Sequence, residues 1–182
     1  GFSISGPESR KLLSRICRDD LNPSSFKFRD IRETYVGGVP CLLNRMSFTG
    51  ELGYEVYTSP QFHLKLFEEI ENNGEDLKLS LFGSRALMSL RLEKNWGAWG
   101  LDYRPDFTIL ESGLDKFIDW KKDFIGKEAT LKQKEKGIEK KLSIMTVDTS
   151  DIDVINDEAI LSEGKCVGYV TSGGYAHYVK KS

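Results

Sequence analysis

The sequence predicts an α+β fold, in which an antiparallel sheet carries helices on one face and a small β-barrel-like domain follows at the C-terminal end. Two observations predict it. Helical segments alternate with β-rich runs up to residue 136, and after Gly137 short β-runs follow one another closely. We therefore expect a domain boundary there, with residues 1–136 in the α+β domain and residues 137–182 in the barrel-like domain.

The first helix is expected to begin at Pro7. Proline suits the first position of a helix, because it has no backbone N–H and that position needs none. Apolar residues then recur on one helical face, at Leu12, Leu13 and Ile16. The helix is expected to end at Asp19–Asp20, before a loop.

A β-hairpin is expected next. The runs Asp30–Val36 and Pro40–Met46 are rich in residues that favour strands, and Gly37–Gly38 separates them. Gly-Gly between two such runs is typical of a tight hairpin turn.

The stretch Arg45–Val56 indicates a strand, a turn that carries a carboxylate, and a second strand. Thr49–Glu51 supplies turn residues, and Gly53 allows a close approach of two backbones. Alternation of apolar and polar residues resumes from Tyr54. Glu55 is thereby predicted to lie at the start of a strand, beside a glycine turn.

The remaining elements follow from caps, periodicity and glycines. Ser59–Pro60 is expected to begin a helix that ends at Asn73–Gly74, and Ser84 to cap another that runs through Lys94. Residues 78–82 form either a short strand or an extended link, and residues 102–126 look irregular. The other expected elements are a lysine-rich helix from Gly126 to Lys136 and three short strands, Lys141–Val147, Glu158–Leu161 and Cys166–Thr171.

Composition excludes several classes of function. The formal net charge of −2 gives no basic surface for nucleic acid, and no apolar run approaches the ~20 residues that span a membrane. We expect neither nucleic acid nor a membrane as a partner. Three widely spaced cysteines and two histidines support neither a disulfide framework nor a structural zinc site.

Several blocks resemble, in the same order, the aminomethyltransferase family, which includes the glycine cleavage T protein and the folate domains of dimethylglycine and sarcosine dehydrogenases. The blocks are Ser3–Arg10, Arg45–Val56, Gly83–Glu93, Glu111–Leu114, Asp123–Ala129 and Gly168–Gly174. Leu92–Gly100, followed by Asp102, is more similar to the dehydrogenase members than to the free-standing T protein.

The resemblance implies a role in one-carbon metabolism. Members of the family transfer a one-carbon unit from an amine, such as dimethylglycine, sarcosine or an aminomethyl carrier, to tetrahydrofolate. Glu55 matches the glutamate that hydrogen-bonds the pterin ring, and Arg85 matches the arginine that contacts folate. No residue matches the family's catalytic aspartate, so no catalytic residue is assigned and the chain alone is expected to be inactive.

The resemblance also bears on cofactor and location. Tetrahydrofolate is the expected cofactor, and FAD is expected only in an upstream domain of a dehydrogenase parent, because no Gly-x-Gly-x-x-Gly run follows a strand here. The expected location is cytoplasmic, or the mitochondrial matrix in a eukaryote. Gly1–Ile4 resembles the inside of a strand, and the run Val167–Ser182 stops where the family continues into further strands. A fragment cut at both ends is therefore expected, with open strand edges that favour self-association.

Simpler interpretations stay open. Glu55 is also consistent with an ordinary solvated carboxylate, and Arg85 with a surface ion pair. Trp96 and Trp99 suit either a ligand cleft or core packing, and the lysines of residues 132–141 suit a solvated face. At the level of function, the alternatives are a non-catalytic folate-binding or interaction module and a folate-dependent demethylase on the same fold.

Overall fold

The computed structural model describes residues 1–182. The chain forms two compact units, residues 1–96 and residues 97–182. None of its helices combines the length and the apolar character that crossing a bilayer requires. The predicted domain boundary at Gly137 lies inside the second unit and stays a prediction.

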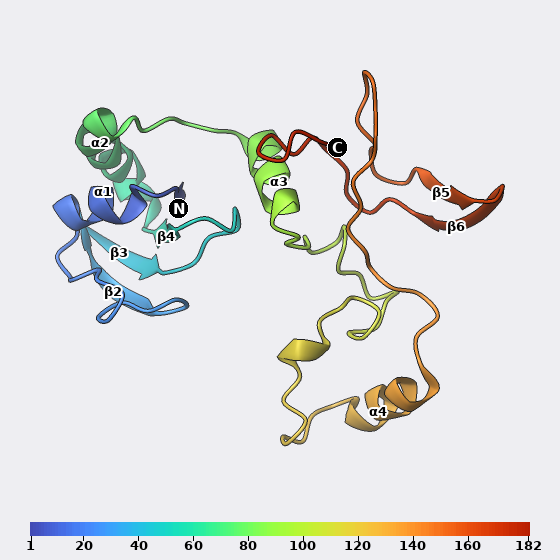
Figure 1. Cartoon of the computed structure of the whole chain (residues 1–182). Helices are drawn as coiled ribbons and strands as arrows, with labels where there is room; N and C mark the ends of the chain where they lie inside the picture. The colour runs from blue at the N-terminus through green and yellow to red at the C-terminus, as the bar shows by residue number, and fades with distance from the viewer. The chain divides into compact units, whose positions relative to one another are not determined.

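The first unit is built on a four-stranded antiparallel sheet in the order β1-β4-β3-β2. Figure 1 labels β2, β3 and β4 of this sheet. Its strands are β1 (Phe2–Ser5), β2 (Ile31–Val36), β3 (Val39–Asn44) and β4 (Gly53–Tyr57). Its helices are α1 (Ser9–Ile16), α2 (His63–Gly74) and α3 (Ser84–Glu93), with single 3-10 turns at Pro60–Phe62 and Glu75–Leu77. The mixed α+β class and the hairpin of β2 and β3 are thus confirmed.

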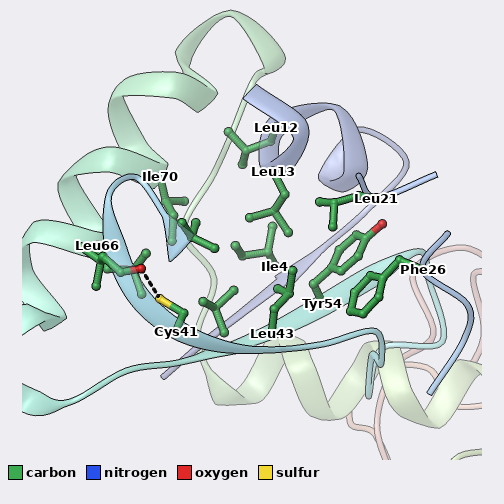
Figure 2. Close-up of a cluster of buried hydrophobic side chains, with 13 residues drawn as sticks. Ile4, Leu12, Leu13, Leu21, Phe26, Cys41, Leu43, Tyr54, Leu66 and Ile70 are labelled. Carbon is green, nitrogen blue, oxygen red and sulfur yellow. Dashed lines mark hydrogen bonds between the residues drawn. The ribbon is translucent and has the colours of Figure 1, made fainter. Parts of the chain in front are cut away.

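Helices α1 and α2 pack on one face of this sheet. Leu12 and Leu13 of α1 are buried, as are Leu66 and Ile70 of α2. They meet a layer of inward-facing strand residues, of which Figure 2 labels Ile4, Leu43 and Tyr54. Val36 and Val56 belong to the same cluster. Removal of this apolar surface from water is the main stabilising contribution of the unit.

Helices α1 and α2 do not cover the opposite face of the sheet, which we call the open face. Side chains alternate along each strand, so Tyr54 and Val56 are buried, whereas Glu55 is half-buried and Tyr57 is exposed. Exposed apolar side chains gather on the same face, from Ile31, Tyr35 and Leu42. The open face is therefore a mixed apolar and polar surface.

The segment from residue 78 to residue 83 links α2 and its 3-10 turn to α3 without regular structure. Of the two alternatives for residues 78–82, the extended link is observed. Helix α3 begins at Ser84, but the capping position is Gly83, and no side chain caps the helix.

The second unit contains a 3-10 turn at Asp115–Phe117, helix α4 (Lys127–Lys136) and a hairpin of β5 (Ala159–Ser162) and β6 (Lys165–Tyr169). The predicted strand Lys141–Val147 is wrong, because that segment is not paired with any strand; its ends bond only to Glu111 and Ser182. The β5-β6 sheet has two strands and closes no barrel, so the barrel-like domain is not confirmed.

Buried apolar side chains are sparse in the second unit, where only Leu110 belongs to the buried hydrophobic set. Trp99 is 86% exposed and Ile125 fully exposed. Polar links hold parts of the unit together. The buried Asp102 accepts hydrogen bonds from the backbone N–H of Ala98 (2.8 Å) and from Thr171 Oγ1 (2.6 Å).

The core of the first unit predicts a large loss of stability for Leu13→Ala. Leu13 is completely buried between helix and sheet, so truncation removes apolar contacts and leaves a cavity. We expect the free energy of unfolding to fall by about 2–5 kcal/mol in urea titrations. The neighbouring, exposed Ser14→Ala is the control and should change it by less than about 0.5 kcal/mol. Equal effects of the two substitutions would contradict the assigned core.

Candidate functional site

Glu55 lies in the middle of the sheet, on the open face. Strand β4 is an interior strand, and Glu55 is paired with Ser3 of β1 on one side and with Asn44 of β3 on the other. The core-facing neighbours Tyr54 and Val56 fix its direction. A carboxylate in this position is held by rigid strands and still accessible from the open face.

Two side chains bind the Glu55 carboxylate. The Tyr57 hydroxyl donates a hydrogen bond to Oε2 at 2.7 Å, and Asn44 Nδ2 approaches the same oxygen at 3.4 Å. Both contacts use Oε2, so Oε1 keeps its acceptor capacity for a ligand. Each carboxylate oxygen has two lone pairs, so Oε1 can accept hydrogen bonds from the N–H groups of a guanidinium or of an amino-pyrimidine edge.

A hydroxyl chain supports the turn before β4. The hydroxyl groups of Ser5 and Ser47 are 3.0 Å apart, and those of Ser47 and Thr49 are 2.8 Å apart. Thr49 Oγ1 also accepts a hydrogen bond from the backbone N–H of Glu51 at 3.3 Å. Thr49 is buried, so these bonds satisfy a hydroxyl that would otherwise be costly to bury.

Gly53 allows this packing at the first residue of β4. A Cβ atom at this position would come within 2.6 Å of Ser47 Cβ, which no side chain tolerates. The Gly53 carbonyl also accepts a hydrogen bond from Arg45 Nη1 at 3.0 Å. The same Cβ atom would lie 3.0 Å from the backbone carbonyl oxygen of Ile4, so the predicted close approach of two backbones is also observed.

The end of α3 contacts the same turn. Lys94 Nζ forms an ion pair with Glu51 at 3.0 Å, and Gly50 lies against the side chains of Lys94 and Trp96. Trp96 also lines a hollow of about 400 Å³ together with Arg45, Phe28 and other residues of the turn. Glu51 thus has a structural partner.

Arg85 lies in the first turn of α3 and is exposed. No hydrogen bond or ion pair joins it to Glu55, and the hollow at Trp96 includes neither residue. A second hollow, of about 790 Å³, also includes neither residue, although Tyr57 lines it. The structure places Glu55 in a strand after a glycine turn, as predicted, but in the middle of β4 and not at its start. It does not bring Arg85 into contact with Glu55.

Asn44 and Tyr57 are site residues that the sequence reasoning missed. Tyr57 stands two residues after Glu55, so strand alternation alone puts the two on one face. To predict that Asn44 lies beside Glu55, one must know the register of β3 against β4, and the hairpin and turn lengths do not determine that register by themselves. The two tryptophans differ in their surroundings. Trp96 lines a hollow, whereas Trp99 is too exposed to pack in the core.

Other reactive groups give no alternative centre. The three cysteines are free, and burial raises the pKa of the Cys41 thiol, which makes its thiolate scarce. No cluster of three or more histidine, cysteine or acidic side chains could hold a metal ion.

The fold and the site define an α+β domain with a carboxylate-bearing open sheet face. Residues 1–122 match the family described as the GCVT N-terminal domain. The chain belongs to this family, that of the aminomethyltransferases and the glycine cleavage T protein.

Curated relatives match over the whole chain. It is 39% identical over 183 residues to the mitochondrial dimethylglycine dehydrogenase of Homo sapiens and 38% identical to that of Rattus norvegicus. It is 34% identical to the aminomethyltransferase of Caldanaerobacter subterraneus subsp. tengcongensis. The chain spans 21% of the length of the two dehydrogenases and 48% of that of the aminomethyltransferase.

The Tyr57–Glu55 hydrogen bond predicts that Tyr57 ionises at a higher pH than an ordinary tyrosine. The pKa of Tyr57 is raised, first because its hydroxyl donates to the Glu55 carboxylate, and further by burial and by the negative charge of Glu55. The stabilisation from this bond is thus present below the usual tyrosine pKa of about 10 and is lost as pH rises through the higher folded-state value.

Tyrosinate absorbance during a pH titration measures this ionisation, and the difference from Tyr57→Phe isolates the Tyr57 signal. In Glu55→Gln the Tyr57 pKa should fall back towards the usual value. A Tyr57 pKa that is the same with and without the Glu55 carboxylate would show that the bond does not form in solution.

Proposed function

We propose that this chain supplies a wall of the tetrahydrofolate site in an aminomethyltransferase-family protein. The observation that carries the proposal is the Glu55 carboxylate, which is held on the open sheet face with Oε1 available to a ligand. The parent protein would transfer a one-carbon unit from an amine to tetrahydrofolate. Dimethylglycine, sarcosine and an aminomethyl carrier are the candidate donors.

The donors of a pterin fit this carboxylate. The amino-pyrimidine edge of a reduced pterin presents N–H groups side by side, and an ionised carboxylate accepts hydrogen bonds without donating any. Apolar side chains on the same face, such as Leu42, suit the flat ring system that accompanies those donors. The residues present therefore match both the polar edge and the apolar face of the ligand.

Arg85 is proposed as a second folate contact. A guanidinium can stack on a ring or bind a carboxylate in bidentate fashion, and folate offers both. Its exposed position at the start of α3 leaves it accessible to a ligand. Arg85 would bind the ligand separately from Glu55, because no hydrogen bond or ion pair joins the two residues.

The remaining assignments follow from family membership. Flavin chemistry, where the parent is a dehydrogenase, is proposed for another part of that protein. The β5-β6 hairpin is proposed as part of a barrel-like domain that begins near Gly137.

A mitochondrial matrix location is proposed for a eukaryotic source, since the dehydrogenase relatives are mitochondrial by name, and a cytoplasmic location is proposed otherwise. Self-association through open strand edges, notably β1, is proposed for the chain alone.

Glu55→Gln in the intact protein should weaken tetrahydrofolate binding by about 1–3 kcal/mol, because the amide replaces one acceptor with a donor and leaves ligand N–H groups poorly paired. Titration calorimetry under anaerobic conditions measures the affinity. Glu71→Gln, on the exposed side of α2, is the matched control and should bind as the unchanged protein does. Unaltered affinity in Glu55→Gln would refute the proposal.

Arg85→Gln in the same assay tests the second contact separately. Weaker binding would support Arg85 as a ligand residue. Binding equal to that of the unchanged protein would remove Arg85 from the site and leave the assignment of Glu55 intact.

A further inference from the structure

Tyr57 and Glu55 stand two residues apart on β4 and lie side by side on the open face. Their hydrogen bond, 2.7 Å from the phenol oxygen to Oε2, has the length expected when a hydroxyl donates to an ionised carboxylate. The Asn44 contact with the same oxygen is 3.4 Å long and correspondingly weaker. Tyr57 is therefore the main restraint on the carboxylate.

The Tyr57 ring is itself held in place. Leu42 of β3 is its direct cross-strand partner, and Gly1 lies so close that a Cβ there would come within 2.8 Å of the ring. Aromatic side chains have few torsions, so an ordered ring presents its hydroxyl at a defined point. A glutamate has more torsions and, half-buried at a sheet surface, would sample several rotamers without such a partner.

We propose that Tyr57 is a positioning residue, which fixes Glu55 through Oε2 and so directs Oε1 towards the ligand. The inference rests on the proposed function, since it concerns the same carboxylate. Tyr57 contacts Glu55 and needs no contact with the ligand. Its effect on affinity must then pass through the carboxylate, and it should vanish when the carboxylate is absent.

Tyr57→Phe removes the hydroxyl and keeps the ring. In the intact protein it should weaken tetrahydrofolate binding about three- to tenfold, the value of one hydrogen bond. Tyr169→Phe is the matched control. Tyr169 is also a strand tyrosine, with 37% of its surface exposed against 47% for Tyr57, and the Tyr169 hydroxyl has no partner in the chain. It should leave the affinity unchanged.

A double-mutant cycle separates positioning from general structural loss. In a Glu55→Ala background, where position 55 has no side-chain acceptor for the hydroxyl, Tyr57→Phe should cause no further loss of affinity. An equal loss in both backgrounds would overturn the inference, because the hydroxyl would then act independently of Glu55. If Glu55→Gln alone has no effect, the proposed function fails, whereas a normal affinity in Tyr57→Phe beside a weakened Glu55→Gln defeats only the positioning role.

The positioning role can also be measured without ligand. Three-bond NMR couplings report the rotamer of Glu55 around χ1 and χ2. We expect one dominant rotamer in the unchanged chain and in Tyr169→Phe, and averaged couplings in Tyr57→Phe. A Glu55 side chain that is equally ordered in Tyr57→Phe would overturn the inference whatever the affinities show.

Discussion

The burial of Tyr54 and Val56 against helices α1 and α2 determines which way every side chain of β4 faces. Side chains alternate along a strand, so this burial places Glu55 on the opposite, open face. A slip of one residue would turn Glu55 into the core, where an unpaired carboxylate is strongly unfavourable. The core is thus what holds the candidate site in its orientation.

The turn between β3 and β4 enforces that register. Its hydroxyl chain, the close approach of Gly53 to Ser47, and the Arg45 bond to the Gly53 carbonyl all fix the point at which β4 begins. The Lys94–Glu51 ion pair then ties the end of α3 to the turn. An exposed ion pair of this kind contributes little stability, so the hydroxyl chain and the Gly53 contacts are the main restraints on the turn.

Much of the first unit could be predicted from residue patterns. Helix faces, the Gly37–Gly38 hairpin and the position of Glu55 depend on local periodicity and turn chemistry, which are visible in a sequence. The partners of Glu55 were harder to predict from the sequence, because the contact with Asn44 depends on the register between β3 and β4. In the second unit the strand predicted at residues 141–147 failed, since β-rich composition forms a strand only where a partner strand is available.

Chemical-shift mapping would show whether the ligand binds on the open face beside Glu55. Tetrahydrofolate would be titrated into the isotopically labelled intact protein. We expect the shift changes to concentrate on open-face residues around Asn44, Glu55 and Tyr57. Changes confined to the hollow at Trp96 and Phe28, or spread over the α1–α2 side of the sheet, would contradict it.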